Sequence, residues 1–89
     1  MQYRVLWSPY AEERLERQLQ ESSDPFASVI ALAAREIDAL LISSPVTFGE
    51  SRYDILKIGF VNPLGVDFEV MDDLLTVVVH DVWRIRQRN

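Results

Sequence analysis

Three arginines at the end of the chain are the residues whose type and spacing best suit chemistry. Arg84, Arg86 and Arg88 alternate within the last eight residues, and no acidic residue lies among those eight. In an extended strand, side chains two positions apart share a face and lie roughly 7 Å apart. That spacing suits successive phosphates or the carboxylates of a partner, since a guanidinium binds both through paired N–H groups. The alternative is a solvated tail whose arginines serve solubility.

Lys57 and His80 are further candidates for acid–base or phosphate chemistry. His80 is the only histidine in the chain, and an imidazole changes its charge near neutral pH, as a proton-transfer group must. Lys57 lies in an apolar run typical of a strand, where it supplies a cation. The alternative for His80 is a packing residue with one satisfied hydrogen bond, because valines surround it in sequence.

Asp67 and Glu69 stand two positions apart on one expected strand, so they share a face. Such a pair suits acid–base work or a hard cation, but the sequence offers neither a third ligand nor a histidine at metal spacing. The alternative is that both carboxylates simply face solvent on one side of an antiparallel strand, where their negative charge would repel RNA. A weaker hypothesis is a metal-independent hydrolase that uses His80 with either carboxylate. We expect no metal and no cofactor, because no glycine loop, zinc cluster or dinucleotide fingerprint is present.

Length and composition indicate a single small domain over residues 1–89. The 48% hydrophobic content, with 3 glycines and 4 prolines, is typical of a globular chain. The absence of cysteine removes disulfides and thiolate sites and favours the cytoplasm. A net charge of -5 argues against nucleic-acid binding by the whole surface. We expect no membrane span, since no apolar run is long enough.

The first half of the chain predicts a strand and two helices. Alternation over Tyr3–Trp7 indicates a short strand, after which Ser8 suits a helix cap and Pro9 a first helical position. Asp24 and Pro25 repeat this arrangement before the clearest helix of the sequence. Its apolar positions follow helical spacing and should end near Ser43: Phe26, Ile30, Ala33, Ala34, Ile37, Leu40 and Leu41.

The second half predicts three antiparallel strands, over Tyr53–Phe60, Val66–Val70 and from Leu74 onward, with a tight reversal at residues 71–74. The fold class is therefore α+β, with two N-terminal helices packed on one face of a mainly antiparallel four-stranded sheet, in the order β-α-α-β-β-β. If Val66, Phe68 and Val70 point at the helices, the opposite face carries Asp67 and Glu69, with Lys57 and His80 as companions.

This order of elements and several local strings resemble the RelE/ParE superfamily of bacterial type II toxins. The resemblance spans nearly the whole chain but includes no invariant motif. It rests on Tyr3-Arg4-Val5-Leu6-Trp7-Ser8-Pro9-Tyr10-Ala11, on a helix exit from Pro45 to Gly49, on Leu64-Gly65-Val66-Asp67-Phe68-Glu69-Val70, and on residues 74–82.

The resemblance implies a cognate antitoxin that wraps and neutralises the toxin. RelE-like members are mRNA interferases that cut mRNA on the ribosome, whereas ParE-like members bind DNA gyrase. A RelE-like activity would make Lys57, His80 and Arg84 catalytic. Partner or nucleic-acid binding would fall to Arg52, Arg84, Arg86 and Arg88.

The sequence departs from the RelE-like pattern in two places. It has Leu64-Gly65 where such toxins often carry an arginine, and anions follow on the same strand. A tyrosine or helix beyond the last strand is also absent from the sequence. Whether the chain is an enzyme therefore stays open, and a gyrase-binding or inactive member of the superfamily fits the missing cations at least as well as a ribonuclease. The alternative from another class is a non-catalytic protein-interaction module, such as a homodimer, that binds an acidic partner through its C-terminal arginines.

Overall fold

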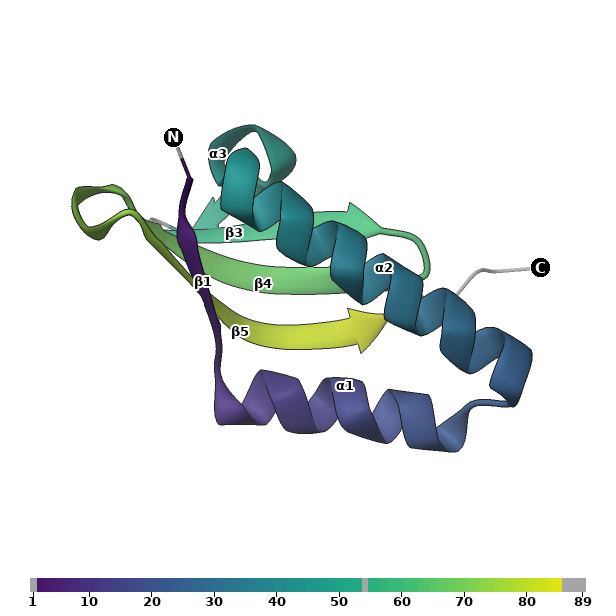
Figure 1. Ribbon diagram of the computed structural model, residues 1–89. Helices are drawn as coiled ribbons and strands as arrows, with labels where there is room; N and C mark the ends of the chain where they lie inside the picture. Colours follow the sequence, from purple (N-terminus) through teal and green to yellow (C-terminus); the bar gives the residue numbers. More distant parts are fainter. Residues whose placement is uncertain (1, 54, 86–89) are drawn as a thin grey trace.

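The structure, a computed structural model, describes residues 2–53 and 55–85. Over these residues the chain forms five strands, three α-helices and one 3-10 helix (Figure 1). The strands are β1 (Arg4–Trp7), β2 (Glu50–Tyr53), β3 (Leu56–Val61), β4 (Leu64–Met71) and β5 (Thr76–Arg84). The helices are α1 (Pro9–Glu21), α2 (Asp24–Ser43) and α3 (Pro45–Phe48), and the 3-10 helix η1 covers Asp72–Leu74.

The strands form one mixed sheet in the order β1-β5-β4-β3-β2. β1 runs parallel to β5, and every other neighbouring pair in the described sheet is antiparallel. The prediction of four strands was wrong. The predicted strand Tyr53–Phe60 begins in β2 and continues in β3, and these two strands pair antiparallel. β2 was not predicted because Glu50, Ser51 and Arg52 are polar. An edge strand with one neighbour needs no alternating apolar face.

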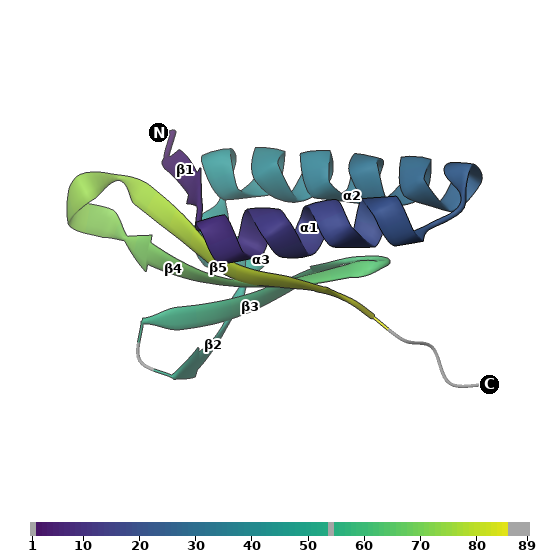
Figure 2. The same ribbon diagram turned by 90° about the horizontal axis from the view of Figure 1, so that it is seen from below.

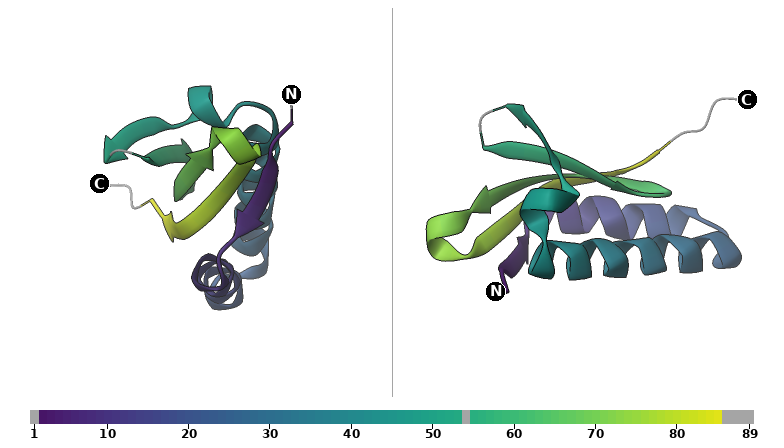
Figure 3. Two further views of the ribbon diagram at one scale, coloured as in Figure 1. Left: turned by 90° about the vertical axis from the view of Figure 1, so that its left-hand side faces the viewer. Right: turned by 90° about the horizontal axis from the view of Figure 1, so that it is seen from above.

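The helices α1 and α2 lie on one side of the sheet, as predicted (Figures 2 and 3). Ser8 caps α1, since its Oγ accepts a hydrogen bond of 3.0 Å from the Ala11 N–H, and Pro9 follows at the start of the helix. The cap of α2 is Ser23 and not Asp24, which is the first helical residue. The short α3, with Pro45 in its first turn, corrects the predicted number of helices.

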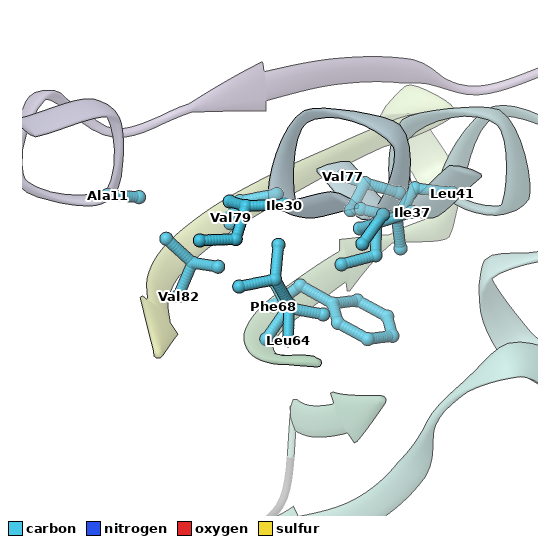
Figure 4. Packing of buried hydrophobic residues seen from close by; sticks show 11 residues of the cluster. Ala11, Ile30, Ile37, Leu41, Leu64, Phe68, Val77, Val79 and Val82 are labelled. Carbon is cyan, nitrogen blue, oxygen red and sulfur yellow. The ribbon is translucent and has the colours of Figure 1, made fainter. Parts of the chain in front are cut away.

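The hydrophobic core lies between the two long helices and the sheet (Figure 4). Val66 and Phe68 are fully buried in it, so their predicted direction is confirmed, and the pleat turns Asp67 and Glu69 to the open face. None of the helices within the described ranges is long and apolar enough to cross a membrane. The other buried members of the core are Ala11, Ile30, Ala33, Ile37, Leu41, Leu64, Val77, Val79 and Val82.

Candidate functional site

His80 lies on the open face of the sheet, beside Glu69. The register between β4 and β5 shifts so that Asp67 pairs with Asp81 and Phe68 with Val79, which leaves His80 as an extra residue of a β-bulge. The His80 Nε2 atom lies 3.1 Å from Glu69 Oε1. A carboxylate therefore already engages the imidazole that was predicted to transfer protons.

Lys57 lies on the opposite, helix-facing side of the sheet. It stands directly across from the buried Phe68, and directly opposed residues of an antiparallel pair share a face. The Lys57 Nζ donates a hydrogen bond of 3.2 Å to Ser51 Oγ. The expectation that Lys57 accompanies His80 was wrong, because a change of one residue in register moves every side chain to the other face.

Arg84 also faces the helices. It pairs with the buried Leu64, and its guanidinium carbon lies 4.0 Å from the centroid of the Phe26 ring in α2. The β4 partners of Lys57 and Arg84 are Phe68 and Leu64, four residues apart and so separated by roughly 13 Å along the strand. The structure therefore does not bring Lys57, His80 and Arg84 together in one site.

The remaining predicted binding residues are only partly covered by the structure. Arg52 belongs to β2, but its side chain lies outside the described part. Arg86 and Arg88 lie outside the described residues altogether. The ladder of terminal arginines therefore stays a prediction, with Arg84 as its one described member.

Aromatic rings cover part of the open face near the end of β5. Trp83 pairs with Gly65, and a Cβ atom at Gly65 would lie only 2.6 Å from Trp83 Cε2. The indole therefore occupies the space that a side chain at Gly65 would need. The Phe60 ring meets Trp83 edge-on, with centroids 6.4 Å apart, and Phe60 is 54% exposed. Residues 2–53 and 55–85 contain no cluster of three His, Asp or Glu side chains that could hold a metal ion.

A cleft of about 1030 Å³ opens at one end of the molecule. The second half of α1, the start of α2, the β3–β4 turn and the end of β5 form its walls. Figure 2 shows these four segments at the same end of the fold. Arg14 and Arg17 enter it from α1 and Arg84 from β5, and Glu21 is the only acidic residue among its described lining residues. The cleft is therefore a cationic region on an acidic protein.

Side chains from α1 close the edge of β5 beside this cleft. β1 pairs with β5 only as far as Val79, so Val82 has no strand neighbour on that side within the described sheet. The Val82 carbonyl accepts hydrogen bonds from Arg14 Nε at 3.4 Å and Gln18 Nε2 at 3.3 Å. Asp81 Oδ1 accepts from the Val82 N–H at 2.8 Å and from Arg14 Nε at 3.1 Å. Both backbone groups of Val82 are thus satisfied without another strand.

Two groups in the cleft keep unused hydrogen-bonding capacity. Arg84 has no carboxylate within ion-pair distance among the described residues, whereas Arg17 pairs with Glu13 at 3.3 Å. Gln18 Oε1 is buried and has no hydrogen-bond donor in the same part of the chain. The buried Gln18 oxygen is out of reach of a ligand, so a ligand of this cleft would present an anionic group to Arg84.

The opposite end of β5 carries a different polar contact. The Tyr3 hydroxyl donates a hydrogen bond of 2.7 Å to Asp72 Oδ1, which joins the residue before β1 to η1. This hydrogen bond, together with burial and the negative charge of Asp72, raises the pKa of Tyr3 above its ordinary value of 10.0. Tyr3 therefore stays protonated at neutral pH and acts as a donor.

This arrangement of helices and sheet is shared with solved toxin structures. A chain of the RelBE2 toxin–antitoxin complex from Mycobacterium tuberculosis matches with a TM-score of 0.75 and 17% identity, over 94% of this chain and 99% of that one. The chain has the RelE fold. The isolated E. coli RelE toxin matches with a TM-score of 0.62 and 13% identity, over 98% of this chain and 88% of that one.

The RelE fold is recognisable here in structure and not in sequence. A chain of the intact E. coli RelBE toxin–antitoxin complex matches with a TM-score of 0.64 and 14% identity, over 97% of this chain and 99% of that one. No protein-family model and no curated protein matches the sequence.

Sequence reasoning missed the residues that build the cleft from the helical side. Arg14 and Gln18 are four residues apart, so they share one helical face, and this spacing was the available signal. Phe26 was assigned to the core through its apolar periodicity, and its contact with Arg84 depends on where β5 ends. The pairing of the strands sets the end of β5, so this contact could not be predicted from the sequence of α2.

Proposed function

We propose that this chain is the toxin of a type II toxin–antitoxin system, acts in the cytoplasm of a bacterium, and is neutralised by a cognate antitoxin protein. The RelE fold over nearly the whole chain supports this proposal. Two of the structures that share the fold are toxin–antitoxin complexes. The low sequence identity leaves the target of the toxin to the chemistry of its surface.

The toxin inhibits growth by binding a protein target, with DNA gyrase as the candidate, and not by cutting mRNA on the ribosome. Metal-free cleavage of a phosphodiester needs cations around the scissile phosphate and an acid and a base within reach. The observation that supports this choice is that the three candidate side chains do not lie on the same face of the sheet. His80 contacts Glu69 on the open face, whereas Lys57 and Arg84 face the helices.

Inducible expression in a bacterial host tests both parts of the proposal. We expect growth arrest without the neighbouring gene, relief of the arrest when that gene is co-expressed, and intact translated mRNA throughout the arrest. A supercoiling assay with purified DNA gyrase then tests the target. Discrete cuts in translated mRNA would overturn the protein-binding mode, and normal growth of the expressing cells would overturn the toxin assignment.

A non-catalytic interaction module is the second candidate. The cleft lined by Arg14, Arg17 and Arg84, here called the arginine cleft, favours it. The lining of this cleft combines Arg84, free of described carboxylates, with apolar side chains, as a protein-binding surface does. Normal growth together with retained partner binding would favour the module. Sedimentation of the purified chain would show whether the module is a homodimer.

A further inference from the structure

The arginine cleft has the size of a site for a polymer segment. Its volume of about 1030 Å³ lies at the upper limit of pockets that enclose small molecules, which hold about 300–1,000 Å³. Its walls come from α1, α2, the β3–β4 turn and β5, so a ligand there would contact both layers of the fold. A chain segment fits such a cleft better than a single metabolite.

The charge of the cleft selects an anionic ligand. Arg84 has no carboxylate partner among the described residues, whereas Arg14 and Arg17, the other arginines of the lining, pair with Asp81 and Glu13. The Arg84 guanidinium lies over the Phe26 ring and has no described carboxylate partner, so its N–H groups can bind a carboxylate of a ligand. The stacked ring also restricts the arginine side chain, so less conformational entropy is lost on binding.

Gln18 fixes the helical side of the cleft. Its Nε2 group donates to the Val82 carbonyl, and its Oε1 atom is buried without a donor among the described residues. The buried oxygen is out of reach of a ligand, so the contacts of a ligand fall to Arg84 and the apolar lining.

The remaining lining favours a peptide over RNA. Phe26, Val29, Pro63 and Ile85 make an apolar wall, and Val29 is 47% exposed. A ligand with apolar side chains would bury this wall, whereas a phosphate backbone would leave it in contact with water. RNA affinity also depends on the number of phosphates neutralised, and Arg14 and Arg17 are already paired with carboxylates.

We propose that this cleft binds an acidic, amphipathic peptide segment of a protein partner. A carboxylate of the segment binds the N–H groups of Arg84, and apolar side chains cover the wall around Phe26. The inference rests on the proposed function only in taking a protein as the partner, and adds the place and the chemistry of the contact.

Selection of random peptides displayed on phage against the full-length protein tests this proposal. We expect the enriched peptides to combine carboxylates with apolar residues. Substitution Arg84→Gln should weaken their binding about tenfold or more, because a charge-assisted hydrogen bond is lost. Substitution Arg35→Gln removes the same charge from an exposed position on α2 outside the cleft and should leave the affinity unchanged.

A measurement on the unmodified protein keeps the test independent of variant folding. Adding a selected peptide should shift the NMR signals of the Gln18 side-chain amide and the Arg84 Nε–H group, since both residues line the cleft. Enrichment of basic peptides, unchanged binding by Arg84→Gln, or unshifted Gln18 and Arg84 signals would each overturn the proposal. So would a single-stranded RNA oligonucleotide that displaces the peptides and depends on Arg84.

The growth assay separates this inference from the proposed function. Growth arrest by a chain that selects no acidic peptides would overturn the cleft assignment alone. Peptide binding at the cleft by a chain that leaves growth normal would support the cleft assignment and overturn the toxin proposal.

Discussion

The guanidinium carbon of Arg84 lies 4.0 Å from the centroid of the Phe26 ring, so one contact joins the end of the sheet to the start of α2. Arg84 is exposed, and we expect a coupling energy of about 0.5–1 kcal/mol between the two side chains. A double-mutant cycle with Arg84→Ala and Phe26→Leu, followed by urea unfolding, measures it. The matched cycle with Arg35→Ala should show no coupling, and equal coupling in both cycles would contradict the contact.

The hydrogen bond from Tyr3 to Asp72 makes the stability of the fold depend on pH in the alkaline range. It raises the pKa of Tyr3 above 10.0, so the folded protein holds this proton more tightly than the unfolded chain. The contribution to stability is complete below the unfolded pKa and is lost as the pH rises through the folded one. Asp72→Ala should bring the Tyr3 pKa back toward 10.0 in ultraviolet titration of the phenolate. An equal change in Asp73→Ala would show that charge alone, and not the hydrogen bond, causes the shift.

Asp81 should stabilise the fold through the backbone more than through its ion pair. Its carboxylate accepts from the buried Val82 N–H at 2.8 Å and from Arg14 at 3.1 Å. Asp81→Ala leaves this N–H unsatisfied and should cost about 1–3 kcal/mol. Asp81→Asn keeps an acceptor and loses only a half-exposed ion pair, at a cost of less than about 1 kcal/mol. Equal losses in urea unfolding would show that the ion pair dominates.

The elements with regular apolar patterns could be predicted from the sequence. α2 and β4 each bury one face, so helical spacing from Phe26 and alternation from Val66 to Val70 located them. β2 has polar residues at an edge and carries no such pattern. The parallel pairing of β1 with β5 joins segments about 70 residues apart, and no local pattern encodes it.

The candidate site could not be predicted because its geometry depends on two irregular features. Without a bulge, His80 and Arg84 would share a face, since they are four positions apart and side chains alternate along a strand. The extra residue at His80 reverses the alternation and turns Arg84 toward Phe26. The turn between β3 and β4 sets the register that places Lys57 across from Phe68. Neither feature can be derived from the types of the candidate residues.

Because Lys57 and His80 lie on opposite faces of the sheet, we predict that neither is needed for growth inhibition. A general acid or base contributes about 10²–10⁴-fold to a rate, so its loss would be obvious in a growth assay. We expect the variant Lys57→Ala/His80→Gln to inhibit growth as the unmodified chain does. Both side chains make surface hydrogen bonds in the structure, so stability should change little. Abolished inhibition by a variant with unchanged urea unfolding would restore a catalytic role.

Trp83 and Gly65 give the sharpest test of the open face. A Cβ atom at residue 65 would lie 2.6, 2.7 and 2.8 Å from three atoms of the indole, so Gly65→Ala must displace Trp83 from the sheet. We expect a loss of about 1–3 kcal/mol in urea unfolding, typical of overpacking, and a change in tryptophan fluorescence. In a Trp83→Leu background the displaced ring is absent, and Gly65→Ala should then cost much less. An equal cost in both backgrounds would mean that the strand conformation at residue 65, and not the indole above it, requires glycine.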